Sequence, residues 1–229
     1  MSIELLYTIA IDENGDSVHI DKAQKGIKYF CPECKNEFIL RKSGKTGKGS
    51  RRAHFAHDAT ENCNRDDYLH SSFQILLLEK MKECLKNGLP LDITWKCNYC
   101  KNEHSANLLG GVFDIKHEYD MKICRPDIAL LNEKGNVISV IELINTHKPE
   151  EYAVNHYKNN NIVLIKILLD SLEDLEKIEI KIKHPSEVDF CFNMLKQKYY
   201  QIIINPNIIA AYVPMHKDYY HRREQIRRR

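Results

Sequence analysis

Two acidic residues stand beside or within apolar, β-prone runs in the second half of the chain. Asp127 opens the run Ile128–Leu131, and Glu142 lies near the end of the run Val137–Leu143. A carboxylate in such a run is costly to bury unless it is paired or bound to a cation. The two acids therefore indicate either a divalent metal site or two exposed strand ends.

Four of the eight cysteines form C-x-x-C pairs, Cys31 with Cys34 and Cys97 with Cys100. This spacing suits tetrahedral zinc. The chain shows no signal peptide and no apolar run of the length that a membrane span needs. We therefore expect a cytoplasmic protein without a membrane partner, whose cysteines bind zinc rather than form disulfides.

The first cysteine pair needs two further ligands, and the next candidates along the chain are His54, His57 and Cys63. On a straight strand His54 and His57 would face opposite ways, so only one of them faces the cysteines. We predict that His57 and Cys63 complete this zinc site. His54 is then left for packing or for contact with a phosphate.

The second pair gives half of a zinc site. His104, His117 and Cys124 are all candidates for the missing ligands of Cys97 and Cys100. The sequence does not choose among them.

The formal net charge is only +2, so the overall charge does not indicate a nucleic-acid partner. Two local clusters are basic: the stretch from residue 41 to 52, which has no acidic residue, and the arginine-rich last nine residues. Both are either solvated segments or contacts for phosphates. The basic residues of the first stretch are Arg41, Lys42, Lys45, Lys48, Arg51 and Arg52.

Hydrophobic patterning predicts a β-rich N-terminal part followed by an α/β part. The two apolar runs beside the acids form a hairpin, because residues 132–136, N-E-K-G-N, supply turn chemistry. Apolar residues three and four apart predict a helix over about 67–87. Further elements are expected as strands at 113–121 and 162–169 and as helices at 150–158, 171–177 and 188–199. The order of elements describes an α/β sandwich.

These motifs together resemble the competence protein CoiA-like family over roughly residues 8–170. The resemblance rests on C-P-E-C, on H-F-A-H followed by Cys63, on a helix bearing His70, and on R-P-D-I followed by I-E-L. It implies a β-rich zinc-binding module at 1–65, a nuclease domain of the PD-(D/E)xK, restriction-endonuclease-like type at 66–180, and a C-terminal extension at 181–229. It also implies that Asp127 and Glu142 bind Mg²⁺ or Mn²⁺ and that His70 adds a polar group to the site.

One position departs from the family pattern. The lysine expected two residues after the glutamate is replaced by Ile144. That lysine would polarise the scissile phosphate, so another group must take its place or catalysis is lost. The candidates are His147, Lys148 and Lys158. In the first helix, Gln74 holds a place where the family carries a lysine, and Asp66 stands for the acidic residue before it.

Three functions follow from these observations. The first is a metal-dependent endonuclease acting on DNA, in which Asp127, Glu142 and the Leu143 carbonyl hold Mg²⁺ and the zinc module assists binding; a homodimer would cut both strands. The second is a catalytically inactive nuclease fold that serves as a nucleic-acid-binding or assembly module. The third assigns catalysis to the zinc module, with His54 as general base.

Overall fold

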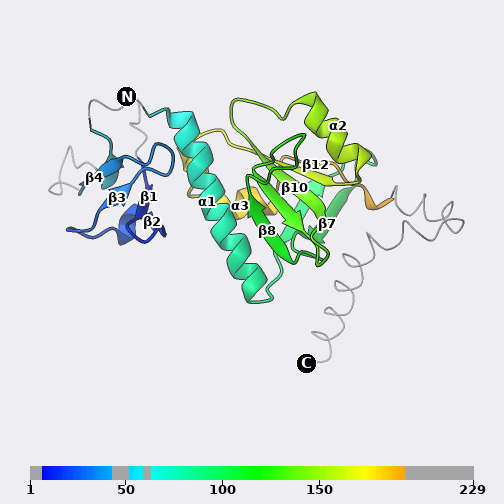
Figure 1. Cartoon of the computed structure of the whole chain (residues 1–229), viewed down its shortest axis with the longest axis horizontal. Coiled ribbons are helices and arrows are strands. Elements are labelled where there is room, and N and C mark those ends of the chain that lie inside the picture. Colours follow the sequence, from blue (N-terminus) through cyan, green and yellow to red (C-terminus); the bar gives the residue numbers. More distant parts are fainter. Residues whose placement is uncertain (1–6, 43–51, 59–62, 194–229) are drawn as a thin grey trace, which may run out of the picture. The chain divides into compact units, whose positions relative to one another are not determined.

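The chain divides into two compact units in the computed structural model, which describes residues 7–42, 52–58 and 63–193. Unit 1 comprises residues 1–77 and 169–178, and unit 2 comprises residues 78–168 and 179–229. Figure 1 shows both units as combinations of helix and strand. The predicted mixed α/β class is confirmed.

Unit 1 is built on an antiparallel five-stranded sheet in the order β2-β1-β3-β4-β5. The strands are β1 (Ile9–Asp12), β2 (Ser17–His19), β3 (Tyr29–Phe30), β4 (Glu37–Arg41) and β5 (His54–Ala56). A short 3-10 helix, η1, follows β2 at Ile20–Lys22. Phe38 and Phe55 stack across β4 and β5 with ring centroids 5.6 Å apart and form part of the core of this unit.

The longest helix, α1 (Arg65–Lys86), begins in unit 1. The hydroxyl of its buried Tyr68 accepts a hydrogen bond from the Ile9 N–H at 2.9 Å and donates one to the Ile9 carbonyl at 2.8 Å. This pair of bonds connects the start of α1 to β1 and satisfies both backbone polar groups of Ile9.

Unit 2 is built on a mixed sheet in the order β12-β11-β10-β9-β8. Strands β8 (Asp114–His117), β9 (Ile128–Leu131) and β10 (Val137–Ile144) form an antiparallel meander. Helix α2 (Glu151–Asn159) then leads to β11 (Val163–Leu168), which runs parallel to β10, and β12 (Glu187–Val188) lies at the edge. A separate hairpin pairs β6 (Asp92–Lys96) with β7 (Glu103–Asn107).

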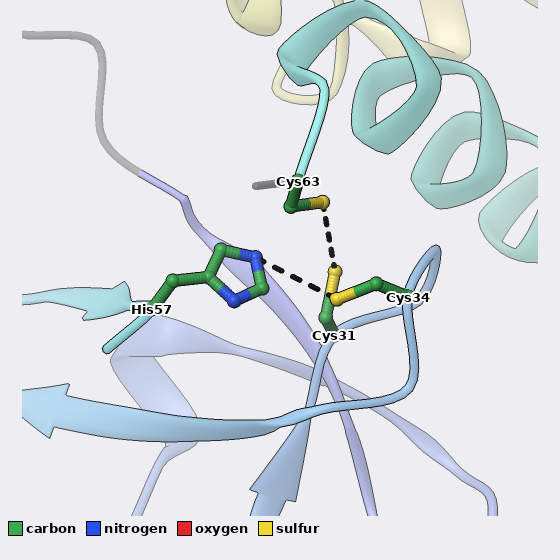
Figure 2. A group of neighbouring side chains, drawn as sticks. All are labelled: Cys31, Cys34, His57 and Cys63. Carbon is green, nitrogen blue, oxygen red and sulfur yellow. Dashed lines mark hydrogen bonds between the residues drawn. The ribbon is translucent and has the colours of Figure 1, made fainter. Parts of the chain in front are cut away.

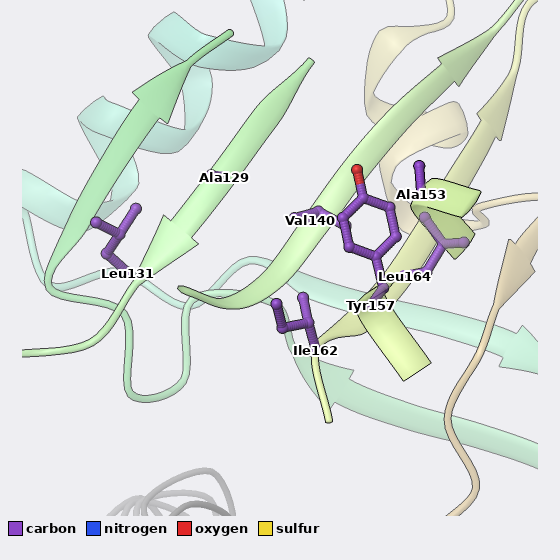
Figure 3. Close-up of a cluster of buried hydrophobic side chains, with 7 residues drawn as sticks. All are labelled: Ala129, Leu131, Val140, Ala153, Tyr157, Ile162 and Leu164. Atoms are coloured by element: carbon purple, nitrogen blue, oxygen red, sulfur yellow. The ribbon is translucent and has the colours of Figure 1, made fainter. Parts of the chain in front are cut away.

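Helix α2 covers one face of the mixed sheet. Its Ala153 and the ring of Tyr157 pack on side chains of β9, β10 and β11, as Figure 3 shows. The cluster consists of Ala129, Leu131, Val140, Ala153, Tyr157, Ile162 and Leu164. Side chains alternate along a strand, so every second residue counted from a member of this cluster lies on the face that α2 covers.

Two sequence predictions fail at the carboxyl end of the described chain. Residues 171–177 contain only a single 3-10 turn, η2 (Leu172–Asp174), and the next helix is α3 (Ile178–Lys183). Asp174 is buried, and its carboxylate accepts the backbone N–H groups of Asp170 at 2.7 Å and of Ser171 at 3.3 Å, which completes a capping box at the start of this turn. The helix expected over 188–199 is wrong at its start, because Val188 pairs with Ile165 in the sheet; residues 192–193 are helical, and residues 194–199 lie outside the described residues.

No helix in the described ranges has the length and apolar character needed to cross a membrane.

Candidate metal centres and the acidic pair

Cys31, Cys34, His57 and Cys63 come together in unit 1 (Figure 2), and we call them the first Cys3His cluster. Their ligand atoms all lie within 4.8 Å of one another. The sulfurs of Cys31 and Cys63 are 3.7 Å apart, and the Cys34 sulfur is 4.0 Å from His57 Nε2. The structure thus joins the four residues that the sequence selected for the first zinc site.

The knuckle between β3 and β4 positions the two cysteines of C-P-E-C. The Cys31 N–H donates to the Asn36 carbonyl at 2.9 Å, and the Lys35 N–H donates to the Cys31 carbonyl at 3.1 Å. Lys35 has a φ of 62°, a left-handed conformation that non-glycine residues seldom adopt. This turn bends the chain so that both thiols point to the same place.

His57 and Cys63 reach the cluster from the chain between β5 and α1. The His57 ring lies 4.6 Å from the ring of Phe38 and 5.4 Å from that of Tyr7, which hold its orientation. Cys63 stands two positions before the first residue of α1. Aromatic packing and the start of a helix therefore place the last two donors.

The donor set and spacing fit zinc. In a tetrahedral site with Zn–S bonds of about 2.3 Å, two sulfurs are about 3.8 Å apart, whereas a disulfide needs about 2.05 Å. Burial raises the pKa of the Cys63 thiol, and the neighbouring Cys31 raises it further. Several thiolates can share this place only with a cation among them, and three sulfurs with one imidazole nitrogen suit Zn²⁺.

A second Cys3His cluster lies in unit 2 and contains Cys97, Cys100, His104 and Cys191. His104 Nε2 is 3.3 Å from the Cys100 sulfur and 3.7 Å from the Cys191 sulfur. Burial lowers the pKa of His104, which keeps its imidazole neutral and able to act as a ligand.

Among the alternatives considered for this second site, the structure selects His104. His117 and Cys124 are not members of the cluster. Cys191 was missed by sequence reasoning, because 87 residues separate it from His104.

The other histidines predicted from sequence lie outside these clusters. The ring of His54 directs Nδ1 to the Arg52 carbonyl at 2.9 Å. His70 is half-buried on α1 and His147 is exposed beyond the end of β10. In the basic stretch, Arg41, Lys42 and Arg52 are exposed, whereas Lys45, Lys48 and Arg51 lie outside the described residues.

Asp127 and Glu142 lie opposite each other on neighbouring strands. Val140 pairs with Ala129, and continuing this antiparallel register by two residues brings Glu142 opposite Asp127. Both acids then share the face that α2 covers. Asp127 Oδ2 accepts the Leu143 N–H at 2.7 Å, and Glu142 Oε1 accepts the Tyr157 hydroxyl at 2.8 Å.

The two acids do not by themselves make a metal site with three protein side chains. Among the described residues, the groups of three or more converging His, Cys, Asp or Glu are the two Cys3His clusters. The predicted Mg²⁺ or Mn²⁺ therefore stays a proposal. Mg²⁺ is commonly held by one or two carboxylates with water and substrate phosphates, so the pair is compatible with it.

The position of the missing lysine is filled by a buried side chain. Ile144 is 7% exposed and pairs with Leu168 of β11. Of the candidates to replace it, Lys148 is exposed after β10, and the Lys158 ammonium lies 3.8 Å from Asp189 Oδ2.

A lysine that sequence reasoning missed stands next to Glu142. Lys166 of β11 pairs in register with Glu142, so both side chains emerge on the same face of the sheet. The Lys166 ammonium is 2.9 Å from Glu187 Oε2 on β12. Lys166 is the single charged residue in the apolar run V-L-I-K-I-L, and this was the sequence signal that could have identified it as a candidate site residue.

Comparison with known proteins matches the N-terminal part of the chain to a family model. Residues 13–66 match the family model for the competence protein CoiA, N-terminal domain. This segment contains the whole first Cys3His cluster and ends at the beginning of α1, and it confirms the resemblance for the N-terminal part. No curated protein and no solved structure matches the chain.

Proposed function

We propose that the protein is a metal-dependent nuclease that hydrolyses phosphodiester bonds in DNA. The observation that carries the proposal is the row formed by Asp127, the residue directly before β9, with Glu142 of β10 and Lys166 of β11. Two carboxylates beside one ammonium are the groups that a restriction-endonuclease-like site uses. Here the ammonium comes from β11 instead of from the position of Ile144.

The order of elements supports this reading. A long helix precedes an antiparallel meander, and a helix then crosses to a strand parallel to the last strand of the meander. This is the arrangement expected for a PD-(D/E)xK core. The two acids lie at the open end of the β9–β10 hairpin, away from its turn.

The site residues have distinct tasks in this proposal. Asp127, Glu142 and the Leu143 carbonyl would hold Mg²⁺ or Mn²⁺. The ion, when bound, lowers the pKa of a water molecule and neutralises charge on the scissile phosphate. The Tyr157 hydroxyl orients Glu142, and burial raises the pKa of Tyr157, so this hydroxyl stays protonated and donates. The Lys166 ammonium would attract a phosphate oxygen in place of Glu187.

The N-terminal module would contribute affinity rather than chemistry. Arg41, Lys42 and Arg52 are the exposed ends of the basic stretch and would contact the DNA backbone. Such contacts make binding strongly dependent on salt and weakly dependent on base sequence.

Cleavage assays test the proposal. Purified protein is incubated with plasmid, linear duplex and single-stranded DNA in the presence of Mg²⁺ or Mn²⁺. We expect cleavage that falls by at least about 100-fold in Asp127→Asn and Glu142→Gln, and that also falls in Lys166→Met. Lys177→Met is the matched control, because Lys177 is an exposed lysine whose ion pair among the described residues is local, with Glu173 at 3.2 Å. Undiminished cleavage by Asp127→Asn, or none by the wild type with either metal, would refute the proposal.

A DNA-binding protein without nuclease activity is the second candidate. It is favoured by Ile144 at the usual lysine position and by the engagement of Glu142 with Tyr157 and of Lys166 with Glu187. Fluorescence anisotropy with labelled DNA in EDTA, run beside the cleavage assay, separates the two candidates. Tight binding without cleavage in either metal supports the second one.

A further inference from the structure

We propose that the second Cys3His cluster binds a structural Zn²⁺ that joins the β6–β7 hairpin to the chain following β12. This site lies outside the segment that matches a known family model. It is independent of the nuclease proposal, since none of its ligands belongs to the acidic row.

The strongest argument is that unit 2 repeats the knuckle of the first cluster. Residues 31–37 read C-P-E-C-K-N-E and residues 97–103 read C-N-Y-C-K-N-E. The same K-N-E follows the second cysteine in both. The two heptapeptides therefore share the cysteine spacing and also the residues that shape the turn.

The backbone of the two knuckles is also the same. The Cys97 N–H donates to the Asn102 carbonyl at 2.9 Å, and the Lys101 N–H donates to the Cys97 carbonyl at 3.0 Å. Lys101 has a φ of 62°, as Lys35 has. A strained left-handed lysine at the same place in both knuckles indicates one local geometry used twice.

The flanking strands keep the same register. Phe30 pairs with Glu37 in the first hairpin, and Lys96 pairs with Glu103 in the second. One pair further from the turn, Tyr29 faces Phe38 and Trp95 faces His104. The second hairpin thus places its own histidine where the first has a phenylalanine, so it needs only one ligand from elsewhere.

Cys191 supplies that ligand, and several contacts hold its segment in place. The Trp95 indole N–H donates to the Phe190 carbonyl at 3.3 Å, and the Tyr99 hydroxyl donates to Asp189. The Phe192 ring packs edge-on against the His104 ring at 5.4 Å. The cysteine is therefore delivered to the cluster by contacts on both sides of it.

The donor set selects the metal and its role. Three sulfurs and one nitrogen suit zinc and exclude Mg²⁺ and Ca²⁺, which prefer oxygen ligands. Four protein ligands leave no coordination position for water or substrate, which is typical of structural zinc. Cys97 and Cys191 are 0% and 5% exposed, so the ion would be shielded.

The consequence concerns the edge of the mixed sheet. Strand β12 pairs with β11 over two residues, Val188 and Glu187, and the Asp189 N–H donates to the Leu164 carbonyl at 2.8 Å. So short a strand is weakly held by its ladder alone. Zinc bound two residues after Asp189 would anchor β12 and with it Glu187, the partner of Lys166.

Metal analysis of the full chain tests this inference. Native mass spectrometry and elemental analysis of the wild type should give two zinc ions per chain, one for each Cys3His cluster. X-ray absorption should show three sulfurs and one nitrogen around the average zinc. Cys191→Ser should lower the count to one, and Cys34→Ser should do the same. Cys84→Ala is the control, because Cys84 is buried on α1 outside both clusters and its loss should leave both ions.

The wild-type measurement keeps the test decisive even where a variant misfolds. A single zinc per wild-type chain that is lost in Cys34→Ser overturns the inference. So does an unchanged count of two in a folded Cys191→Ser protein. A thiol titration showing Cys97 and Cys191 oxidised to a disulfide in the zinc-loaded protein would also overturn it.

Discussion

Asp127 has a structural task in addition to the one proposed for it in catalysis. Its carboxylate accepts the backbone N–H of Leu143 at 2.7 Å, at the point where the β9–β10 ladder ends. Leu143 is 4% exposed, so this N–H has little access to water. A buried N–H without an acceptor lowers stability. Substitutions of Asp127 that keep or remove an acceptor oxygen therefore separate its structural task from its catalytic one.

Asp127→Ala should lower the free energy of unfolding by about 1–3 kcal/mol, because the Leu143 N–H loses its partner. Asp127→Asn keeps an oxygen acceptor at this place and should cost less. Both variants should lose cleavage, since neither carries the carboxylate. Urea unfolding followed by circular dichroism measures the difference, and equal stability of the two variants would contradict the structural task.

Tyr157 gives a second residue-scale prediction. Tyr157→Phe keeps the ring in the α2 core and removes the hydroxyl that donates to Glu142 at 2.8 Å. We expect a loss of about 1 kcal/mol, because water can replace part of the bond at the half-buried carboxylate. Tyr152→Phe on the same helix, where the tyrosine is 58% exposed, should change the unfolding free energy by less than about 0.5 kcal/mol.

At the scale of elements, β11 is the strand that brings the row together, and its sequence explains why. The strand is buried on both faces apart from Lys166 and Leu168, and α2 packs on the face that these two residues share with Leu164. Its parallel register with β10 pairs Glu142 with Lys166. The Lys166 side chain therefore lies beside that of Glu142.

Leu164→Ala in this strand should lower the free energy of unfolding by about 2–5 kcal/mol, because Leu164 is 2% exposed within the α2 cluster and leaves a cavity. Leu168→Ala on the same strand is the matched control. Leu168 is 42% exposed, so its truncation should cost under about 1 kcal/mol. Chemical denaturation of both variants checks this, and similar losses would show that α2 does not seal this face.

The elements that could be predicted from the sequence are those whose signals are local. The hairpin of β9 and β10 was predictable because β-branched runs flank the turn residues 132–136, and the first cluster because its four ligands fall within residues 31–63. Cys191 and Lys166 were not predictable in the same way. Lys166 meets Glu142 through the register of β11, and Cys191 meets its cluster through contacts distant in sequence. Local sequence patterns predict neither.

The turn at Leu172–Asp174 shows another limit. Residues 171–177 have the composition of a helix with a serine cap, yet Asp174 folds back on the N–H groups of Asp170 and Ser171 at 2.7 and 3.3 Å. These bonds belong to a capping box, which satisfies backbone donors at the start of a helix. The helical path nevertheless stops after one 3-10 turn and resumes at Ile178, and composition does not reveal where it stops.

At the scale of the whole molecule, each compact unit contains one Cys3His cluster. The first cluster lies wholly in unit 1, and the second lies wholly in unit 2. Structural zinc contributes folding free energy to the part of the chain that its ligands connect. Loss of one ion should therefore be felt mainly in one unit.

Hydrogen exchange followed by mass spectrometry measures this separation. Cys34→Ser should increase exchange in β3, β4 and β5 while β9, β10 and β11 stay protected. Cys191→Ser should increase exchange in β6, β7 and β12 and leave unit 1 unchanged, because its ligands draw together only elements of unit 2. A strong chelator should open both sets of strands, and zinc added back should restore them. If either single variant exposes both units alike, the two units open as one cooperative unit, and the prediction that each ion stabilises mainly its own unit is wrong.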